Sequence, residues 1–247
     1  MNCSTFPMRI KIRFLLVFFI FFSSLIQAEM HVGAAYTYDG FQRDYAFGPW
    51  HLFQLEAGRE ELLGRVHWAH RQTPGIQYEI ESYPKFSEIG YAYLAAAYSA
   101  FSIFPTYRIG AEWYQVLWKG FESSAGLRYF DFPAQKVLIY TGSATAYLER
   151  YTFSLKGYAS SADGSANILI RRYWDDVSYM GLVVGGGTLP PESTLALAQR
   201  PGFYMMGGEA KYELSRDVFG LTSILYRNEG ASGSQITIST GVQSRIF

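Results

Sequence analysis

The stretch from Arg108 to Phe130, RIGAEWYQVLWKGFESSAGLRYF, decides the fold. Glycine, charged and aromatic residues alternate along it, and it contains no long run of aliphatic residues. Side chains on an extended strand point alternately to opposite faces, so residues of one parity share a face. The odd-numbered residues of the first half, such as Ile109 and Trp113, are apolar, whereas the even-numbered ones include Arg108 and Glu112. The second half alternates in the same way, which predicts two β-strands with one apolar and one charged face each.

The two halves meet at a short Lys-Gly sequence, which predicts a β-hairpin. With a loop of Lys119 to Phe121, antiparallel pairing places Glu112 opposite Arg128 on the charged face. The same register places Tyr114 over Gly126. Opposite charges that face each other across two strands stabilise the pairing, and an aromatic ring covers a strand glycine well.

The first 28 residues have the composition of a secretory signal peptide. Arg9, Lys11 and Arg13 precede an apolar run from Phe14 to Phe22, and a small residue follows at Ala28. This run is shorter than the roughly 20 residues that a membrane-spanning helix needs. We therefore predict a signal peptide over residues 1–28 and a single mature domain over residues 29–247.

Composition narrows the classes of function. The chain has one cysteine, Cys3, which precedes the apolar run, so neither a disulfide nor a lipid anchor is expected in the mature chain. Cleavage after Ala28 leaves 18 basic and 21 acidic residues, a net charge of −3, and no basic patch that suggests nucleic acid binding. No metal-ligand spacing or nucleotide motif is present, and we predict no cofactor and no metal.

Alternating segments of about ten residues, separated by turn residues, continue to the end of the chain. This pattern is the signature of a transmembrane β-barrel. We predict fourteen antiparallel strands, or twelve if the weak early pair is merged or discarded. They cover His31–Tyr38, Trp50–Ala57, Leu62–Arg71, Gln77–Ser82, Ile89–Ala100, Tyr107–Trp118, Glu122–Phe130, Lys136–Leu148, Tyr151–Ala159, Ala166–Trp174, Val177–Gly186, Phe203–Leu214, Val218–Arg227 and Gln235–Ile246.

Alternation alone does not say which face is buried, so a soluble β-sandwich or lipocalin-like barrel is the alternative. Three features favour the bacterial outer membrane: the signal peptide, the aromatic residues near strand ends and the aromatic last residue, Phe247. The two longest connections, 39–49 and 187–202, also fall on the end where such barrels carry their long loops. One feature departs from the usual pattern, because Gln243 and Arg245 share the parity of Phe247.

Several blocks resemble the YaiO-type outer-membrane β-barrel family. They are Tyr83-Pro84-Lys85-Phe86, FSIFPTYRIGAEWYQVL, GFESSAGLRYFDF, VLIYTGSATAYLERYTFSLKGY and SANILIRRYWDD, and together they cover roughly Tyr36 to Gly187. The resemblance implies a barrel in the cell envelope. It implies no activity, because the family has no established biochemical function, although its members are loosely connected with surface glycans.

If the apolar face meets lipid, the charged face lines the lumen, because an Arg or Lys facing lipid at midplane costs about 2–4 kcal/mol. The predicted luminal charges are Arg65, His67, Arg71, Glu79, Glu81, Arg108, Glu112, Glu122, Arg128 and Arg171. In the sequence Arg171-Arg172 the second arginine then points outward, where it anchors the chain at the membrane interface beside Trp174. The luminal charges either compensate one another structurally or line a path or pocket for a charged or hydroxylated ligand.

His67 and Glu81 are the weak catalytic candidates. A loop of Gln72 to Ile76 places them opposite each other, and a nearby serine, Ser82 or Ser124, would complete a hydrolase arrangement. No Gly-x-Ser-x-Gly motif accompanies them.

The sequence therefore favours a pore, binding or envelope-support protein linked to surface-glycan or small-solute traffic. Its expected partners are outer-membrane lipids and lipopolysaccharide, with a glycan or small solute as ligand. A lipid- or glycan-modifying enzyme is the alternative.

Overall fold

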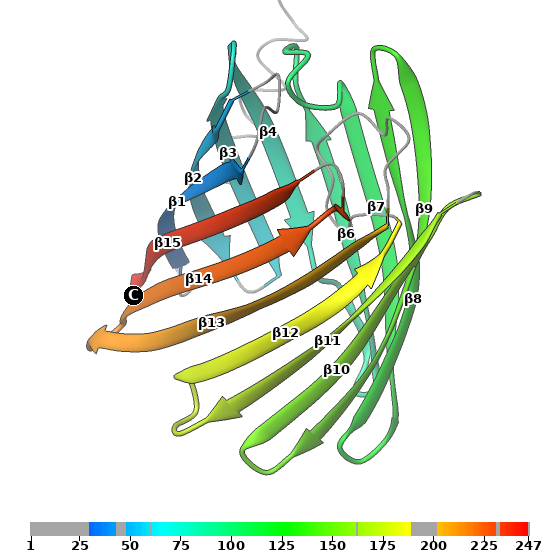
Figure 1. The fold of residues 1–247 in the computed structure, drawn as a ribbon. Coiled ribbons are helices and arrows are strands. Elements are labelled where there is room, and N and C mark those ends of the chain that lie inside the picture. Colours follow the sequence, from blue (N-terminus) through cyan, green and yellow to red (C-terminus); the bar gives the residue numbers. More distant parts are fainter. Residues whose placement is uncertain are drawn as a thin grey trace, which may run out of the picture.

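The computed structural model describes residues 30–42, 48–59, 61–161, 163–188, 202–230 and 233–246. The predicted signal peptide, residues 1–28, lies outside these ranges and stays a prediction. Across the described ranges the chain forms one antiparallel sheet that closes on itself (Figure 1). None of the described segments is a helix long and apolar enough to cross a membrane.

The sheet contains fifteen strands, counted over the described residues. They are β1 (Met30–Gln42), β2 (Trp50–Arg59), β3 (Leu62–His70), β4 (Pro74–Ser82), β5 (Lys85–Ser87), β6 (Gly90–Tyr98), β7 (Tyr107–Trp118), β8 (Phe121–Phe132), β9 (Gln135–Leu148), β10 (Tyr151–Ala159), β11 (Gly164–Tyr173), β12 (Tyr179–Gly187), β13 (Phe203–Ser215), β14 (Val218–Asn228) and β15 (Ser234–Ile246).

Two pairings close the barrel. β1 pairs with β15 over its whole length, and β4 pairs with β6. The short β5 continues β4 rather than adding a position to the wall, because Ser82 pairs with Leu94 and Lys85 pairs with Tyr91 in one register. The break between them falls at Pro84, which has no N–H to donate. The barrel therefore has fourteen strand positions, which confirms the predicted fourteen and not the alternative of twelve.

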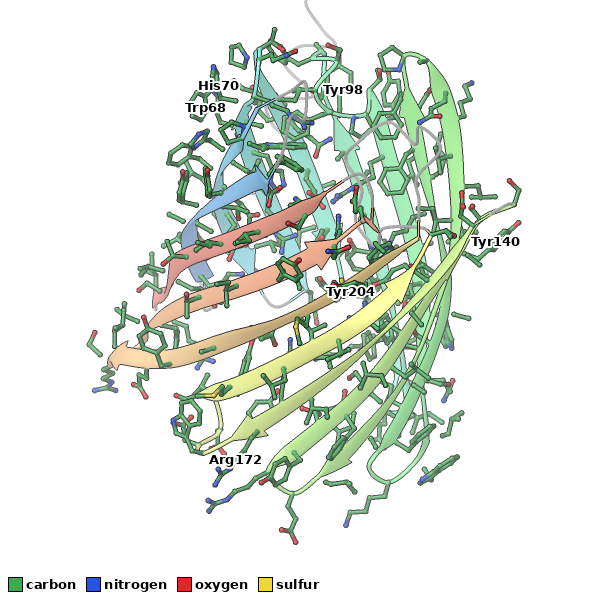
Figure 2. All side chains as sticks on the ribbon, in the orientation of Figure 1. Trp68, His70, Tyr98, Tyr140, Arg172 and Tyr204 are labelled. Atoms are coloured by element: carbon green, nitrogen blue, oxygen red, sulfur yellow. The ribbon has the colours of Figure 1, made fainter. Side chains whose placement is uncertain are left out.

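The apolar faces point away from the barrel axis. Leu55 on β2, Leu182 on β12 and Val184 on β12 are 63%, 64% and 59% exposed. Figure 2 shows Trp68 and Tyr140 pointing outward in the same way. The residues of opposite parity point inward, and they include buried carboxylates such as Glu79. This arrangement confirms the predicted orientation, in which the apolar face is outside and the charged face lines the lumen.

The two ends of the barrel differ. Met30 pairs with Ile246, so both ends of the described chain lie at one end of the barrel, called here the terminal end. Its turns are tight: at Lys119-Gly120 the glycine takes a φ of 80°, and at Asp217 φ is 62°. The opposite end, called the loop end, carries both connections that the sequence predicts to be the longest, which follow β1 and β12, although the β6–β7 connection is longer than the one after β1.

The first of these connections is shorter than predicted. It was expected over 39–49, but Asp39 belongs to β1, which runs to Gln42. Asp39 and its successors continue to pair with β15, which reaches equally far. Residues 43–47 of this connection and 189–201 of the predicted 187–202 loop lie outside the described residues, whereas Gly187 ends β12.

The register of the β7–β8 hairpin differs from the prediction by two residues. Glu112 faces Gly126, and Arg128 faces Gly110. The predicted register, with Glu112 directly opposite Arg128, is therefore wrong. The turn is shorter than the assumed loop, and a bulge lies between Val116 and Trp118. Because the shift is an even number, the side chains before the bulge keep their predicted faces. Beyond the bulge, Trp118 pairs with Phe121 and stacks on its ring.

The β3–β4 register was also wrong. His67 faces Gln77, and Glu81 faces Leu63, whereas the sequence predicted His67 opposite Glu81. The reason is that β4 begins at Pro74, three residues before the predicted start. Proline is tolerated as the first residue of a strand, where no ladder hydrogen bond is lost.

The connection between β6 and β7 folds into the loop end of the barrel. Its Phe104 is 2% exposed and packs against Trp50 of β2 and Ala69 of β3. The neighbouring Ile103 lies so close to Gly75 of β4 that a Cβ there would come within 2.3 Å of its side chain. A second apolar cluster on β8 and β9 faces the lumen at the same end and contains Phe130, Phe132, Val137 and Ile139. Apolar side chains therefore narrow the loop end.

Candidate luminal site

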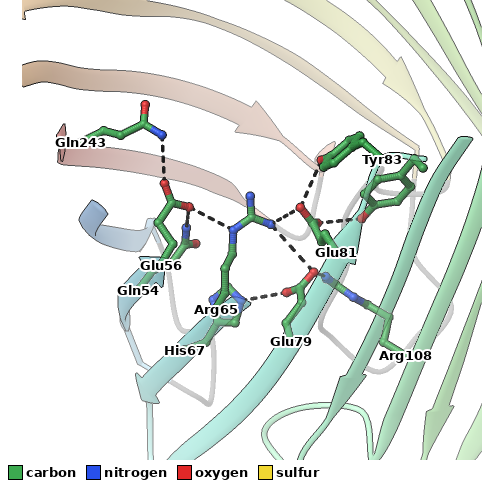
Figure 3. Close-up of polar contacts among 10 residues, drawn as sticks. Gln54, Glu56, Arg65, His67, Glu79, Glu81, Tyr83, Arg108 and Gln243 are labelled. Atoms are coloured by element: carbon green, nitrogen blue, oxygen red, sulfur yellow. Dashed lines mark hydrogen bonds and ion pairs between the residues drawn. The ribbon is translucent and has the colours of Figure 1, made fainter. Parts of the chain in front are cut away.

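Glu79 of β4 is the centre of a charged cluster in the lumen (Figure 3). Its carboxylate accepts a hydrogen bond from a guanidinium nitrogen of Arg108. It also lies 2.8 Å from His67 Nε2 and 4.0 Å from Arg65 Nη1. Only 1% of the Glu79 side chain is exposed, so three basic groups on β3 and β7 surround one buried carboxylate.

Arg65 of β3 connects this cluster to two further carboxylates. Its Nη1 lies 2.6 Å from Glu81 of β4, and its Nε lies 3.1 Å from Glu56 of β2. Tyr83 and Tyr93 donate their hydroxyls to Glu81 at 3.1 Å and 2.8 Å. The strand register explains this proximity, because Glu56, Arg65 and Glu79 follow one another across β2, β3 and β4 on the inward face.

A second cluster surrounds Glu112 of β7. The hydroxyls of Ser124 and Thr141 donate to its carboxylate at 2.5 Å and 3.1 Å. Arg128 Nη2 lies 3.9 Å from the same carboxylate, so the predicted ion pair exists as a long, diagonal contact. Glu122 lies on the neighbouring strand β8, closer to the hairpin turn. Its carboxylate accepts hydrogen bonds from the hydroxyls of Tyr91 and Tyr147 at 3.4 Å each.

The opposite wall of the barrel contains a third charged group, an ion pair between an arginine and a glutamate. Arg171 Nε of β11 lies 2.6 Å from Glu209 of β13, and its guanidinium stacks 4.7 Å from the ring centre of Tyr179. Arg171 therefore points inward, as predicted. Arg172 is exposed on the outer face near the terminal end (Figure 2), also as predicted. Its role as an interface anchor stays a prediction.

The turn that follows these arginines is fixed by Asp175. Its Oδ1 accepts hydrogen bonds from the backbone N–H of Ser178 and of Val177, at 2.5 Å and 2.8 Å. These two bonds hold the pKa of the Asp175 carboxyl below its ordinary value.

Arg71 also lies inside the barrel, within electrostatic reach of Asp39. Its guanidinium lies 5.1 Å from the ring centre of Phe41 and 6.0 Å from that of Trp50. These contacts place it in the narrowed loop end, where aromatic faces stabilise the cation.

The structure does not bring the two catalytic candidates together as predicted. His67 contacts Glu79, whereas Glu81 is held by Arg65 and two tyrosine hydroxyls. Ser124 is engaged with Glu112 and with the Ser143 hydroxyl at 2.6 Å. Their catalytic role stays a prediction.

Sequence reasoning missed several members of the network. Glu56 and Gln54, which donates to Glu56 at 3.1 Å, lie on the inward face of β2. Both residues have even numbers, and in this predicted strand the even-numbered residues share the inward face. That parity was the signal available in the sequence. Tyr83 was missed because it lies at the break between β4 and β5.

Two cavities remain between these side chains. The larger, about 370 Å³, lies between β1–β3 and β12–β15 and is bordered by Glu56, Arg65, Tyr179 and Glu209. The smaller, about 200 Å³, lies beside Glu79 and is bordered by Arg65, Arg108 and Arg128. Both contain Gln54 and Arg65 in their walls, so they adjoin each other. Within the ranges that the structure describes, no three His, Cys, Asp or Glu residues are placed to hold a metal ion.

A closed antiparallel barrel with an apolar exterior and a charged, partly hollow interior defines the class of protein, an outer-membrane β-barrel. The model of the YaiO membrane beta barrel domain matches residues 29–192. The chain belongs to this family, and the predicted resemblance is confirmed.

Solved structures show the same fold at low sequence identity. The outer membrane protein Omp33 of Acinetobacter baumannii is 11% identical, with a TM-score of 0.58 over 88% of this chain and 98% of that one. The CymD monoaromatic hydrocarbon channel is 10% identical, with a TM-score of 0.53 over 89% of each chain. No curated protein sequence matches the chain. The family and these barrels place the protein in the bacterial outer membrane.

Proposed function

We propose that the barrel is a pore that lets small polar solutes cross the outer membrane. The observation that carries this proposal is the hollow, hydrophilic lumen, where two adjoining cavities of about 370 Å³ and 200 Å³ are bordered by charged and hydroxylated side chains. A barrel whose only role was structural would gain nothing from leaving this space unfilled, because close packing stabilises an interior.

The charges of the lumen favour weak ion selectivity. Glu56, Glu79, Glu81 and Glu209 each lie within 4.0 Å of an arginine, so most of the carboxylates are compensated locally. Lys156 of β10 faces inward and is exposed, which supports an open, hydrated lumen beside the paired ions. Pairs of this kind present donors and acceptors to hydroxylated solutes without a strong field that excludes ions of one sign.

The narrowed loop end sets the expected size of the solute. The two apolar clusters, one of which contains Phe104, reduce the opening there, and hydrophobic constrictions limit the passage of water and ions. We expect the pore to pass single small solutes slowly. Surface glycan components and small metabolites are both compatible with this lumen.

The enzyme alternative has less support, because His67 and Glu81 are held by different partners. The expected partners, outer-membrane lipids and lipopolysaccharide, contact the apolar exterior in this proposal.

Planar-bilayer recording of the refolded mature chain tests the proposal. We expect small, steady conductance steps with a permeability ratio of potassium to chloride near one. Bilayers that stay silent after verified insertion of the folded barrel would contradict it and favour a structural role.

A further inference from the structure

Glu122 of β8 is a buried luminal carboxylate without a basic partner. It is 9% exposed. The other predicted luminal carboxylates, Glu79, Glu81 and Glu112, each lie within 4.0 Å of an arginine. Among the described residues, no arginine, lysine or histidine forms an ion pair with Glu122 or acts on it electrostatically. A carboxylate that is removed from water without a compensating charge is unfavourable, so a cation that reaches this position is stabilised there.

The hydrogen bonds of Glu122 leave one of its two oxygens available. Tyr91 and Tyr147 both donate to Oε1, at 3.4 Å each, whereas a hydroxyl donor usually lies about 2.7–2.8 Å from its acceptor. Oε2 accepts no hydrogen bond from the residues that the structure describes, and solvent reaches it. Thr145 faces Glu122 across the β8–β9 pair, but its hydroxyl is hydrogen-bonded to Ser154 at 2.9 Å. Oε2 is therefore open to a donor from solution.

Tyrosine rings lie on both sides of this carboxylate. β6, β7, β8 and β9 are neighbours in that order, so Tyr91 of β6 and Tyr147 of β9 approach Glu122 from opposite directions. The ring of Tyr91 stacks on that of Tyr114, with 4.7 Å between ring centres and 5° between the planes. Tyr147 is 50% exposed and lies at the terminal end of the lumen. The faces of aromatic rings attract cations, so these rings and the carboxylate favour the same kind of ligand.

The arrangement favours an organic ammonium ion over a metal ion. Calcium and magnesium need several oxygen ligands, and no set of three His, Cys, Asp or Glu residues in the described part of the chain is placed to hold a metal. A primary ammonium group has N–H donors for Oε2, and charge-assisted hydrogen bonds of this kind are strong. A quaternary ammonium group has no N–H and would leave Oε2 without a donor. The hydrocarbon part of a primary amine has the tyrosine rings as its contact surface.

We propose that Glu122 binds the ammonium group of a small organic amine at the terminal end of the lumen. The ammonium donates an N–H to Oε2, and the carbon chain lies against the rings of Tyr91 and Tyr147. This inference rests on the proposed function, because a solute reaches Glu122 through the lumen, and it names a class of solute that the pore retains.

Binding to the refolded barrel in detergent micelles tests the site, measured by titration calorimetry at constant ionic strength with micelles alone as the blank. The probes are n-butylammonium and 1-butanol, which have the same carbon chain and differ in charge. We expect n-butylammonium to bind about tenfold more tightly, because the neutral alcohol does not compensate the carboxylate. Tetramethylammonium, which has no N–H, should bind more weakly than n-butylammonium.

Glu122→Gln should weaken n-butylammonium binding by about tenfold and leave 1-butanol binding unchanged. The variant should fold, because glutamine still accepts the two tyrosine hydroxyls and no arginine loses a partner. Tyr147→Leu should weaken n-butylammonium binding by about threefold, because it removes one ring face. Glu213→Gln is the matched control: it removes an exposed carboxylate near the terminal end that forms no ion pair with the described residues, and it should keep the affinity.

Equal binding of n-butylammonium and 1-butanol, the result that a protonated Glu122 would give, overturns the site. Full affinity in Glu122→Gln, or the same loss in Glu122→Gln and Glu213→Gln, also overturns it, because binding would then follow only the overall charge. Tetramethylammonium binding as tight as that of n-butylammonium overturns the hydrogen bond to Oε2. A barrel that conducts without binding n-butylammonium overturns this inference alone, whereas one that binds it without conducting overturns the proposed pore alone.

Discussion

Replacing Glu79 by glutamine tests the charged network where it is most tightly held. The substitution keeps the size and hydrogen-bonding capacity of the side chain and removes its charge. Arg108, His67 and Arg65 then surround a neutral amide in a position that is 1% exposed.

The expected loss of stability follows from this geometry. Removing one partner of a buried ion pair costs about 3–5 kcal/mol, because the remaining charge stays buried without compensation. The Arg108 and Arg65 side chains are 26% and 21% exposed, so water compensates part of their charge. We therefore expect Glu79→Gln to lower the free energy of unfolding by about 3 kcal/mol, the lower end of that range.

Equilibrium unfolding in guanidinium chloride, with the barrel in phospholipid vesicles, measures this change through the fluorescence of the five tryptophans. Glu213→Gln is the matched control, because Glu213 is exposed and forms none of the ion pairs found among the described residues. The double variant Glu79→Gln/Arg108→Met should be more stable than Glu79→Gln alone, since it removes the uncompensated cation. If Glu79→Gln were as stable as the control variant, the network would not stabilise the wall and the reasoning would be refuted.

Two further predictions concern space in the barrel. Phe104→Ala should raise single-channel conductance in planar bilayers, because it removes a buried ring from the narrowed loop end, and an unchanged conductance would show that the constriction lies elsewhere. Gly126→Ala should lower the free energy of unfolding by about 1–3 kcal/mol, since its Cβ would lie 2.5 Å from the Ala111 carbonyl oxygen. Gly157→Ala, which meets nothing within 4 Å, should change it by less than about 0.5 kcal/mol, and equal effects of the two would contradict this account.

The strand positions and their faces follow from the sequence because a strand has a period of two. Alternation such as Arg108, Gly110 and Glu112 against Ile109, Ala111 and Trp113 fixes which residues share a face, whatever the register. Closure of the sheet then orients the apolar set toward lipid.

Register does not follow as directly, because the two sides of a hairpin shift whenever its turn gains or loses a residue. The bulge between Val116 and Trp118 has no signal in the sequence, and a proline at position 74 reads as a turn although it begins β4. Individual partners were therefore mispaired: His67 was assigned to Glu81 and contacts Glu79 instead. The set of luminal charges was predictable, and their contacts depended on turns that only the structure defines.

The orientation of the side chains is the central claim, and cysteine labelling tests it most directly. The sequence contains a single cysteine, Cys3, within the predicted signal peptide, so single-cysteine variants of the mature barrel need no further change. On β10, Lys156 faces the lumen and the adjacent Leu155, 51% exposed, faces lipid. In proteoliposomes, a charged, water-soluble methanethiosulfonate should modify Lys156→Cys and leave Leu155→Cys unmodified. Rapid modification of Leu155→Cys, with Lys156→Cys protected, would contradict the account.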